Sequence, residues 1–119
     1  MEKLHGNIME LGSEWEMIKS ENMVILFNHH SPQELKDISV VHDGEVTQDV
    51  EAGDVLVLHE TEYEILFVGD KANETLRELG HATFKFNDES NADLPGTICL
   101  QKKAIPDLEV GQKVIIKTK

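Results

Sequence analysis

His42 is the residue whose type and position most readily allow chemistry in this chain. It ends the apolar run 38–42, and the Asp43-Gly44 pair after it is a strong turn signal, so we expect the imidazole at a strand exit that a partner can reach. A neutral imidazole keeps one unprotonated nitrogen, which can attack a phosphoryl group or bind a metal while a backbone carbonyl holds the other nitrogen. Residue type and position alone nevertheless favour an ordinary histidine at a strand end.

The histidines do not form a close-spaced set of metal ligands. His29 and His30 are neighbours and point to opposite faces of an extended chain, so a metal site would require distant histidines to converge. Histidines scattered over strands and loops are more often solvated or packed, and we expect no metal and no cofactor. The sequence also lacks the motifs for acyl transfer, nucleotide hydrolysis and dinucleotide binding. The six histidines are His5, His29, His30, His42, His59 and His81.

The chain is short and acidic. Its 119 residues fit one domain, which we expect to span residues 1–119. Asp and Glu number 23 against 11 Lys and Arg, and the net charge of -12 repels nucleic acid but suits brief docking of basic protein surfaces. Cys99 is the only cysteine, so no intrachain disulfide can form, and its place in an apolar run indicates packing. Without a signal peptide or a long apolar span, we expect a cytoplasmic protein that is not inserted in a membrane.

Most of the chain has the pattern of short strands. These runs are apolar or β-branched, and Gly, Asp and Asn punctuate them. Their number and spacing predict a mainly β fold, either a closed barrel or a barrel-like sandwich. The expected strands cover residues 6–11, 23–27, 38–42, 54–58, 64–68, 83–86, 97–100 and 114–117.

Two stretches predict short helices instead. Residues 31–36 offer Ser31 as an N-cap with a proline at the first helical position, and they lead into the His42 strand. Residues 70–79 offer Asp70 as a cap and are followed by Gly80 as a stop, which delivers His81 to the start of the next strand. Trp15 lies outside both stretches, and we expect it to cover one end of the core, with an exposed docking anchor as the alternative.

Two of these segments are similar to a known family. Residues 76–86 (LRELGHATFKF) and 94–97 (LPGT) resemble the central signature of the glucitol/sorbitol-specific enzyme IIA component of the bacterial sugar phosphotransferase system. Residues 42–45 (HDGE) resemble the region that holds the phosphorylated histidine of that family. The chain length and the final strand are also similar to its single-domain form, so the resemblance spans most of the chain.

The resemblance implies a phosphoryl relay on His42. A phosphoryl group would pass from the carrier HPr to His42 and then to the IIB component of a hexitol permease, whose IIC component lies in the membrane; no nucleotide takes part. Backbone N–H groups of Asp43 and Gly44 are candidates to bind the phosphate. His81 is the next candidate residue: it could orient His42, stabilise the phosphoryl group, cap its strand, or be the acceptor itself.

One difference from the family keeps a second hypothesis open. Members of the family carry an extra residue and a second histidine before the Gly-Glu pair, where this chain has only Asp43. The alternative is a non-catalytic binding or regulatory barrel on the same scaffold, since a fold alone does not determine function. The identity of the hexitol and the association of two chains as a homodimer also remain open.

Overall fold

The structure is a computed structural model of the chain and describes residues 1–92 and 94–119. Within these residues it contains eight strands and three short helices. The strands are β1 (Glu2–Leu11), β2 (Met23–Asn28), β3 (Val40–His42), β4 (Val55–Leu58), β5 (Thr61–Val68), β6 (Ala82–Phe86), β7 (Thr97–Leu100) and β8 (Lys113–Lys117). The helices are α1 (Trp15–Ser20), α2 (Gln33–Lys36) and α3 (Ala72–Leu79).

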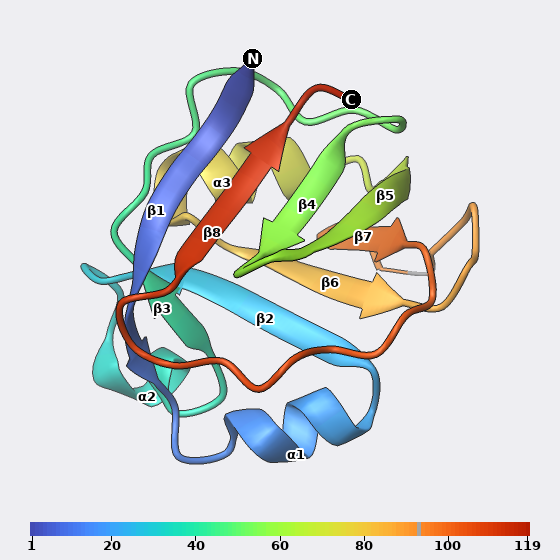
Figure 1. The fold of residues 1–119 in the computed structure, drawn as a ribbon. Coiled ribbons are helices and arrows are strands. Elements are labelled where there is room, and N and C mark those ends of the chain that lie inside the picture. Colours follow the sequence, from blue (N-terminus) through green and yellow to red (C-terminus); the bar gives the residue numbers. More distant parts are fainter. Residues whose placement is uncertain (93) are drawn as a thin grey trace.

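The strands form a closed barrel in the order β1-β3-β2-β6-β7-β5-β4-β8. Most neighbours are antiparallel, but β2 pairs with β3, and β6 with β7, in parallel. In Figure 1 helices α1 and α2 lie toward one end of the barrel, while α3 lies behind β1 and β8. None of the helices described is long and apolar enough to cross a bilayer.

Alternating burial explains how the strands build the core. In β6, Ala82, Phe84 and Phe86 are buried while Thr83 and Lys85 are partly exposed, the period of two that a strand with one buried face requires. In β4 every residue is buried. The inward side chains of the barrel therefore form one continuous core, which α1 extends at its end through the buried side chain of Trp15.

The expected mainly β barrel is confirmed, and its strands lie close to their expected positions. Strand β7 matches at both ends, whereas β1 begins at Glu2 and β5 at Thr61, both earlier than expected. The third strand is shorter than expected and begins at Val40. The expectation of a core-covering Trp15 is also met, since this side chain is 7% exposed.

The expectation of two helices was wrong, because α1 adds a third. Helix α1 has six residues and no side-chain hydrogen bond at its N-cap, so the local sequence carries no start signal, and packing of Trp15 on the core stabilises it. The predicted caps were also displaced: Pro32 and Lys71 occupy the N-cap positions of α2 and α3. Ser31 instead donates a hydrogen bond to Asn28 Oδ1 at 3.3 Å. Gly80 ends α3 as expected, with a φ of 60°.

Candidate functional site

His42 lies at the end of β3, between two neighbouring strands. Strand β2 places Asn28 beside it in parallel register, and β1 places Ile8 beside it in antiparallel register. The side chain is fully buried, with 0% of its surface exposed. The strand exit that the sequence predicted is therefore present, but the imidazole faces into the protein.

Backbone groups hold both nitrogens of the His42 ring. Nε2 lies 2.8 Å from the Gly80 carbonyl oxygen, and the Gly44 N–H donates to Nδ1 at 3.1 Å. Because a carbonyl oxygen can only accept, the hydrogen of the neutral ring is on Nε2 and the lone pair is on Nδ1. The ring is thus fixed in one tautomer.

Burial also keeps this ring neutral. Loss of hydration lowers the pKa of His42 below its ordinary value of 6.5, and the hydrogen bond to Gly80 and the charge of Asp43 only partly oppose that effect. A neutral imidazole has a lone pair available for attack on phosphorus, whereas a protonated one has none. At neutral pH His42 therefore has the electronic state of a nucleophile.

The Asp43 carboxylate forms its hydrogen bonds with Asn7 of β1. Its Oδ1 accepts the Asn7 N–H at 2.7 Å, and its Oδ2 accepts from the Asn7 side chain at 3.4 Å. The Asn7 hydrogen bonds lower the pKa of Asp43, so this group stays ionised. Its backbone N–H donates to the Asn7 carbonyl, so Asp43 fixes the turn against β1.

Two glycines allow the backbone to approach the ring this closely. Gly80 adopts a left-handed conformation at the end of α3, and a Cβ there would lie 2.9 Å from His42 Nε2. Gly44 packs against β1, where a Cβ on Gly44 would lie 2.9 Å from Leu4 Cδ1 and 3.0 Å from Gly6 Cα. The sequence predicted Gly80 as a helix stop, but its contact with His42 depends on strand pairing that no local signal reveals.

A cavity of about 290 Å³ lies close to His42, although His42 itself does not line it. It lies between the last turn of α3 and the segment that follows β3, and both backbone partners of His42 line it. Its lining is Asn28, Gly44, Glu45, Val46, Leu76, Arg77, Glu78 and Gly80.

The sequence comparison identifies the family of this barrel. Residues 3–115 match the family described as the PTS system glucitol/sorbitol-specific IIA component, where PTS denotes the sugar phosphotransferase system. The chain belongs to this family. As a IIA component it is a phosphotransferase relay protein.

Individual relatives agree with this assignment. The glucitol/sorbitol-specific EIIA components of Escherichia coli strain K12 and Shigella flexneri are each 31% identical to this IIA component over 93 residues, covering 77% of this chain and 76% of theirs. The crystal structure of a PTS system IIA component from Enterococcus faecalis V583 superposes with a TM-score of 0.81 at 25% identity, covering 92% of this chain and 96% of that one.

His81, the second candidate residue of this IIA component, lies on the other side of the sheet. Val40 and Ala82 both belong to the core, so alternation along the strands turns His42 inward and His81 outward. The His81 ring stacks on Phe27 at a centroid distance of 3.9 Å, and its Nδ1 donates to the Leu26 carbonyl at 3.0 Å. Among the described residues, no hydrogen bond joins the two histidines.

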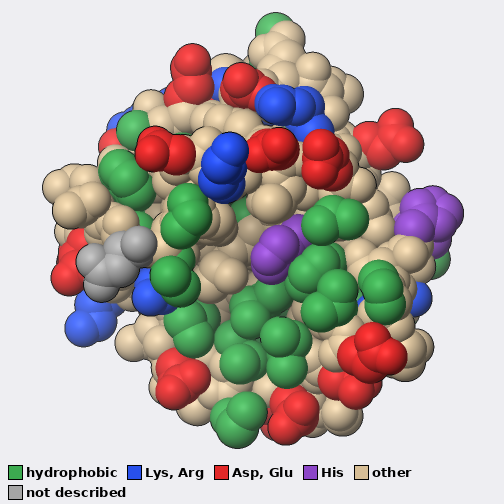
Figure 2. All heavy atoms as spheres, turned by 180° about the vertical axis from the view of Figure 1, so that it is seen from behind, with side chains coloured by type: hydrophobic (Ala, Val, Ile, Leu, Met, Phe, Trp, Pro, Cys, Tyr) green, Lys and Arg blue, Asp and Glu red, His purple; other side chains and the backbone are tan. Residues whose placement is uncertain are grey.

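The outer face near His81 is partly apolar. Because Val24 and Leu26 point into the core, Met23, Ile25 and Phe27 of β2 point outward. In Figure 2, which views the barrel from behind, hydrophobic side chains gather on one face, and charged side chains surround them. Such a surface suits contact with another protein.

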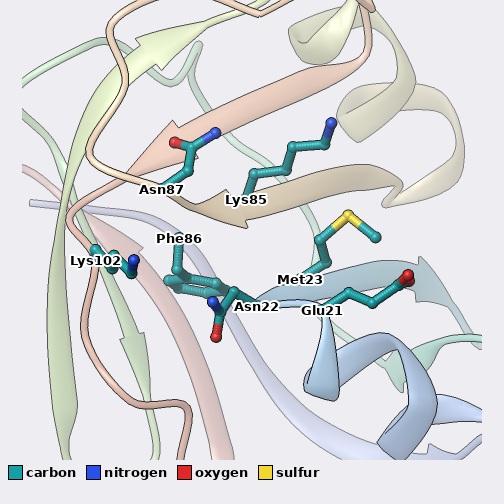
Figure 3. A pocket seen from close by; sticks show the side chains of 7 residues that line it. All are labelled: Glu21, Asn22, Met23, Lys85, Phe86, Asn87 and Lys102. Atoms are coloured by element: carbon teal, nitrogen blue, oxygen red, sulfur yellow. The ribbon is translucent and has the colours of Figure 1, made fainter.

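A second cavity, of about 340 Å³, lies at the opposite end of β2 from His42. Figure 3 shows Lys85 extending away from Phe86, so it does not converge with Lys102. None of the predicted site residues lines this cavity.

The remaining candidates were metal ligands and Cys99. Within residues 1–92 and 94–119, no group of three or more His, Cys, Asp or Glu side chains is placed to hold a metal ion. Cys99 is fully buried, and burial raises the pKa of its thiol. A protonated, enclosed thiol is a packing group rather than a nucleophile.

Proposed function

We propose that His42 is the phosphorylated residue of this IIA component. It accepts a phosphoryl group from phospho-HPr and passes it to the IIB component of a hexitol permease of the glucitol/sorbitol type. Residues 1–119 act as one module in the cytoplasm, where both partners present their phosphorylation sites. The observation that carries this proposal is the neutral, single-tautomer ring of His42 close to a partly open cavity.

The transfer balances without a cofactor. The unprotonated nitrogen of His42 forms a bond to phosphorus while the bond from phosphorus to the donor histidine breaks, and that electron pair stays on the donor nitrogen. The donor ring enters protonated and leaves neutral, and each ring keeps its own proton. His42 becomes a positively charged phosphoimidazole, whose N–H the Gly80 carbonyl stabilises by accepting its hydrogen bond.

Transfer also requires the His42 ring to become accessible to the donor. With 0% of His42 exposed and both nitrogens hydrogen-bonded, phosphorus cannot reach the lone pair in the closed arrangement. The segment after β3 is the natural part to move, because residues 43–54 contain no helix or strand. Docking of the donor protein would supply the interactions that favour the open state.

Burial of the His42 ring, with both nitrogens hydrogen-bonded, also favours the second candidate, a non-catalytic binding or regulatory barrel. In such a protein His42 would only fix the turn against α3. Incorporation of phosphate distinguishes the two functions, because a purely structural histidine takes up none.

The decisive experiment maps the phosphorylated residue. The protein is incubated with HPr, enzyme I and phosphoenolpyruvate, and acid-labile phosphate is located by mass spectrometry in the wild type, in His42→Gln and in His81→Gln. We expect label on His42 of the wild type, none in folded His42→Gln, and substantial label in His81→Gln. Full labelling of His42→Gln would refute the assignment, and its loss on also replacing His81 would move the site to His81.

A further inference from the structure

One cavity is bounded by both backbone groups that hold His42. Gly44 and Gly80, which bond Nδ1 and Nε2, line the same space of about 290 Å³. A phosphoryl group on Nδ1, which replaces the hydrogen bond from Gly44, therefore stands at the wall of this cavity. No other cavity described in this protein includes both glycines.

The charge around this space is unfavourable to phosphate except at one residue. Glu45 and Glu78 line the cavity, and it lies at the C-terminal end of α3, where helix carbonyls carry partial negative charge. Arg77 is the one positively charged residue of the lining. It is also the only arginine of a chain whose net charge is -12. A dianionic group placed here has Arg77 as its only cationic neighbour in the lining.

Arg77 forms an exposed ion pair that it can give up to bind another anion. Its guanidinium pairs with Asp49, but the two side chains are 53% and 63% exposed, and exposed pairs contribute little to stability. A second link between the same two segments does not use Arg77: the Asn73 side chain bonds both the N–H and the carbonyl of Val50, at 2.7 and 3.0 Å. Arg77 can exchange its carboxylate partner while α3 keeps its hold on the segment after β3.

We infer that this cavity is the phosphoryl-binding site of the relay and that Arg77 binds the phosphoryl group there, exchanging Asp49 for it. The inference rests on the proposed function of His42. The planar guanidinium presents paired N–H donors that match two phosphoryl oxygens, which a lysine ammonium does not. Arg77 takes no proton; it stabilises the charge on the equatorial oxygens while the bond from His42 to phosphorus forms.

Matched variants test this inference. Arg77→Gln and Lys71→Gln each remove one positive charge from the same helix region, but Lys71 pairs with Glu74 and does not line the cavity. We expect the maximal rate of transfer from phospho-HPr to fall roughly 10²-fold in Arg77→Gln, to fall less in Arg77→Lys, and to stay near the wild-type value in Lys71→Gln. Asp49→Asn, which frees Arg77, should transfer at least as fast as the wild type.

A second readout separates phosphate binding from a structural role. The ³¹P resonance of phosphorylated His42 is followed against pH, because a bound guanidinium favours the dianion and lowers the midpoint of its titration. Arg77→Gln should raise that midpoint and shorten the lifetime of the phosphohistidine, whereas Lys71→Gln should change neither.

The outcomes distinguish this inference from the proposed function. If label appears on His42 and Arg77→Gln behaves like Lys71→Gln, the role of Arg77 is wrong while His42 stands. If Asp49→Asn loses as much activity as Arg77→Gln, the ion pair is structural and the inference is also overturned. If the wild type carries its label elsewhere than on His42, both proposals fail.

Discussion

At the scale of single residues, His42 links function to acid stability. Burial lowers the pKa of its imidazole in the folded state, so between pH 6.5 and that lowered value the unfolded chain binds a proton that the folded chain does not. The stability that the neutral His42 ring contributes is therefore fully present above pH 6.5 and decreases as the pH falls through this interval. We expect urea midpoints to decrease below pH 6.5 in the wild type and to decrease less in His42→Gln. Burial lowers the pKa of His81 in the same direction, so the difference between these two proteins isolates His42. Equal decreases of the urea midpoint with pH in the wild type and His42→Gln would contradict this prediction.

Gly80 makes a second prediction at this scale. In Gly80→Ala the new Cβ would lie 2.9 Å from His42 Nε2 and from Asn28 Cβ, and the left-handed backbone adds about 1–2 kcal/mol of strain. We expect a lower unfolding midpoint and a large loss of phosphoryl transfer, because the ring must move. Gly111→Ala is the matched control, since Gly111 also has positive φ but no atom lies within 4 Å of its Cβ position. Equal loss of transfer in both variants would show that destabilisation alone explains the effect.

At the scale of elements, the buried Lys3–Asp54 pair joins β1 to the residue before β4. The ammonium and carboxylate are 2.7 Å apart, with side chains 6% and 8% exposed. Lys3→Met leaves the carboxylate buried without its partner, and we expect a loss of about 3–5 kcal/mol in unfolding free energy.

Lys117→Met is the control: its pair with Glu62 is exposed on both sides, and we expect a loss of about 0–1 kcal/mol. Lys3→Met with Asp54→Leu should recover much of the loss, and chemical denaturation measures all three. A loss no greater than that of Lys117→Met would contradict the prediction.

The same scale shows what the sequence could and could not predict. Strands β2, β4 and β7 were predictable because their apolar runs end at turn residues, and α3 because Gly80 marks its end. Helix α1 was not, because it has no capping side chain and depends on the tertiary contact of Trp15. The site divides in the same way. His42 and its turn were visible locally, but its bond to Gly80, 38 residues away, exists only after β3 and β6 have both paired with β2.

At the scale of the whole molecule, closure of the barrel and net charge have separate roles. Pairing of β1 with β8 closes the sheet, whereas the segment after β3 is held outside it by the side chains of Asp43 at its start and of Asn73 at Val50. The charge of -12 acts instead at longer range, on partners that have not yet bound. An acidic relay protein should therefore attract a donor with a basic docking face and repel an acidic one.

Salt tests this long-range attraction. If the donor docks through a basic face, the second-order rate constant of transfer should fall roughly tenfold or more as ionic strength rises from about 0.01 to 1 M, since the screening length shrinks from about 30 to 3 Å. The maximal rate at saturating donor should change much less, because transfer within the complex no longer depends on encounter. Stopped-flow measurement of phosphoryl transfer at several donor concentrations separates the two constants. A maximal rate that falls as steeply as the second-order constant would show that salt acts on the site beside His42, and constants unaffected by salt would show that charge does not guide the encounter.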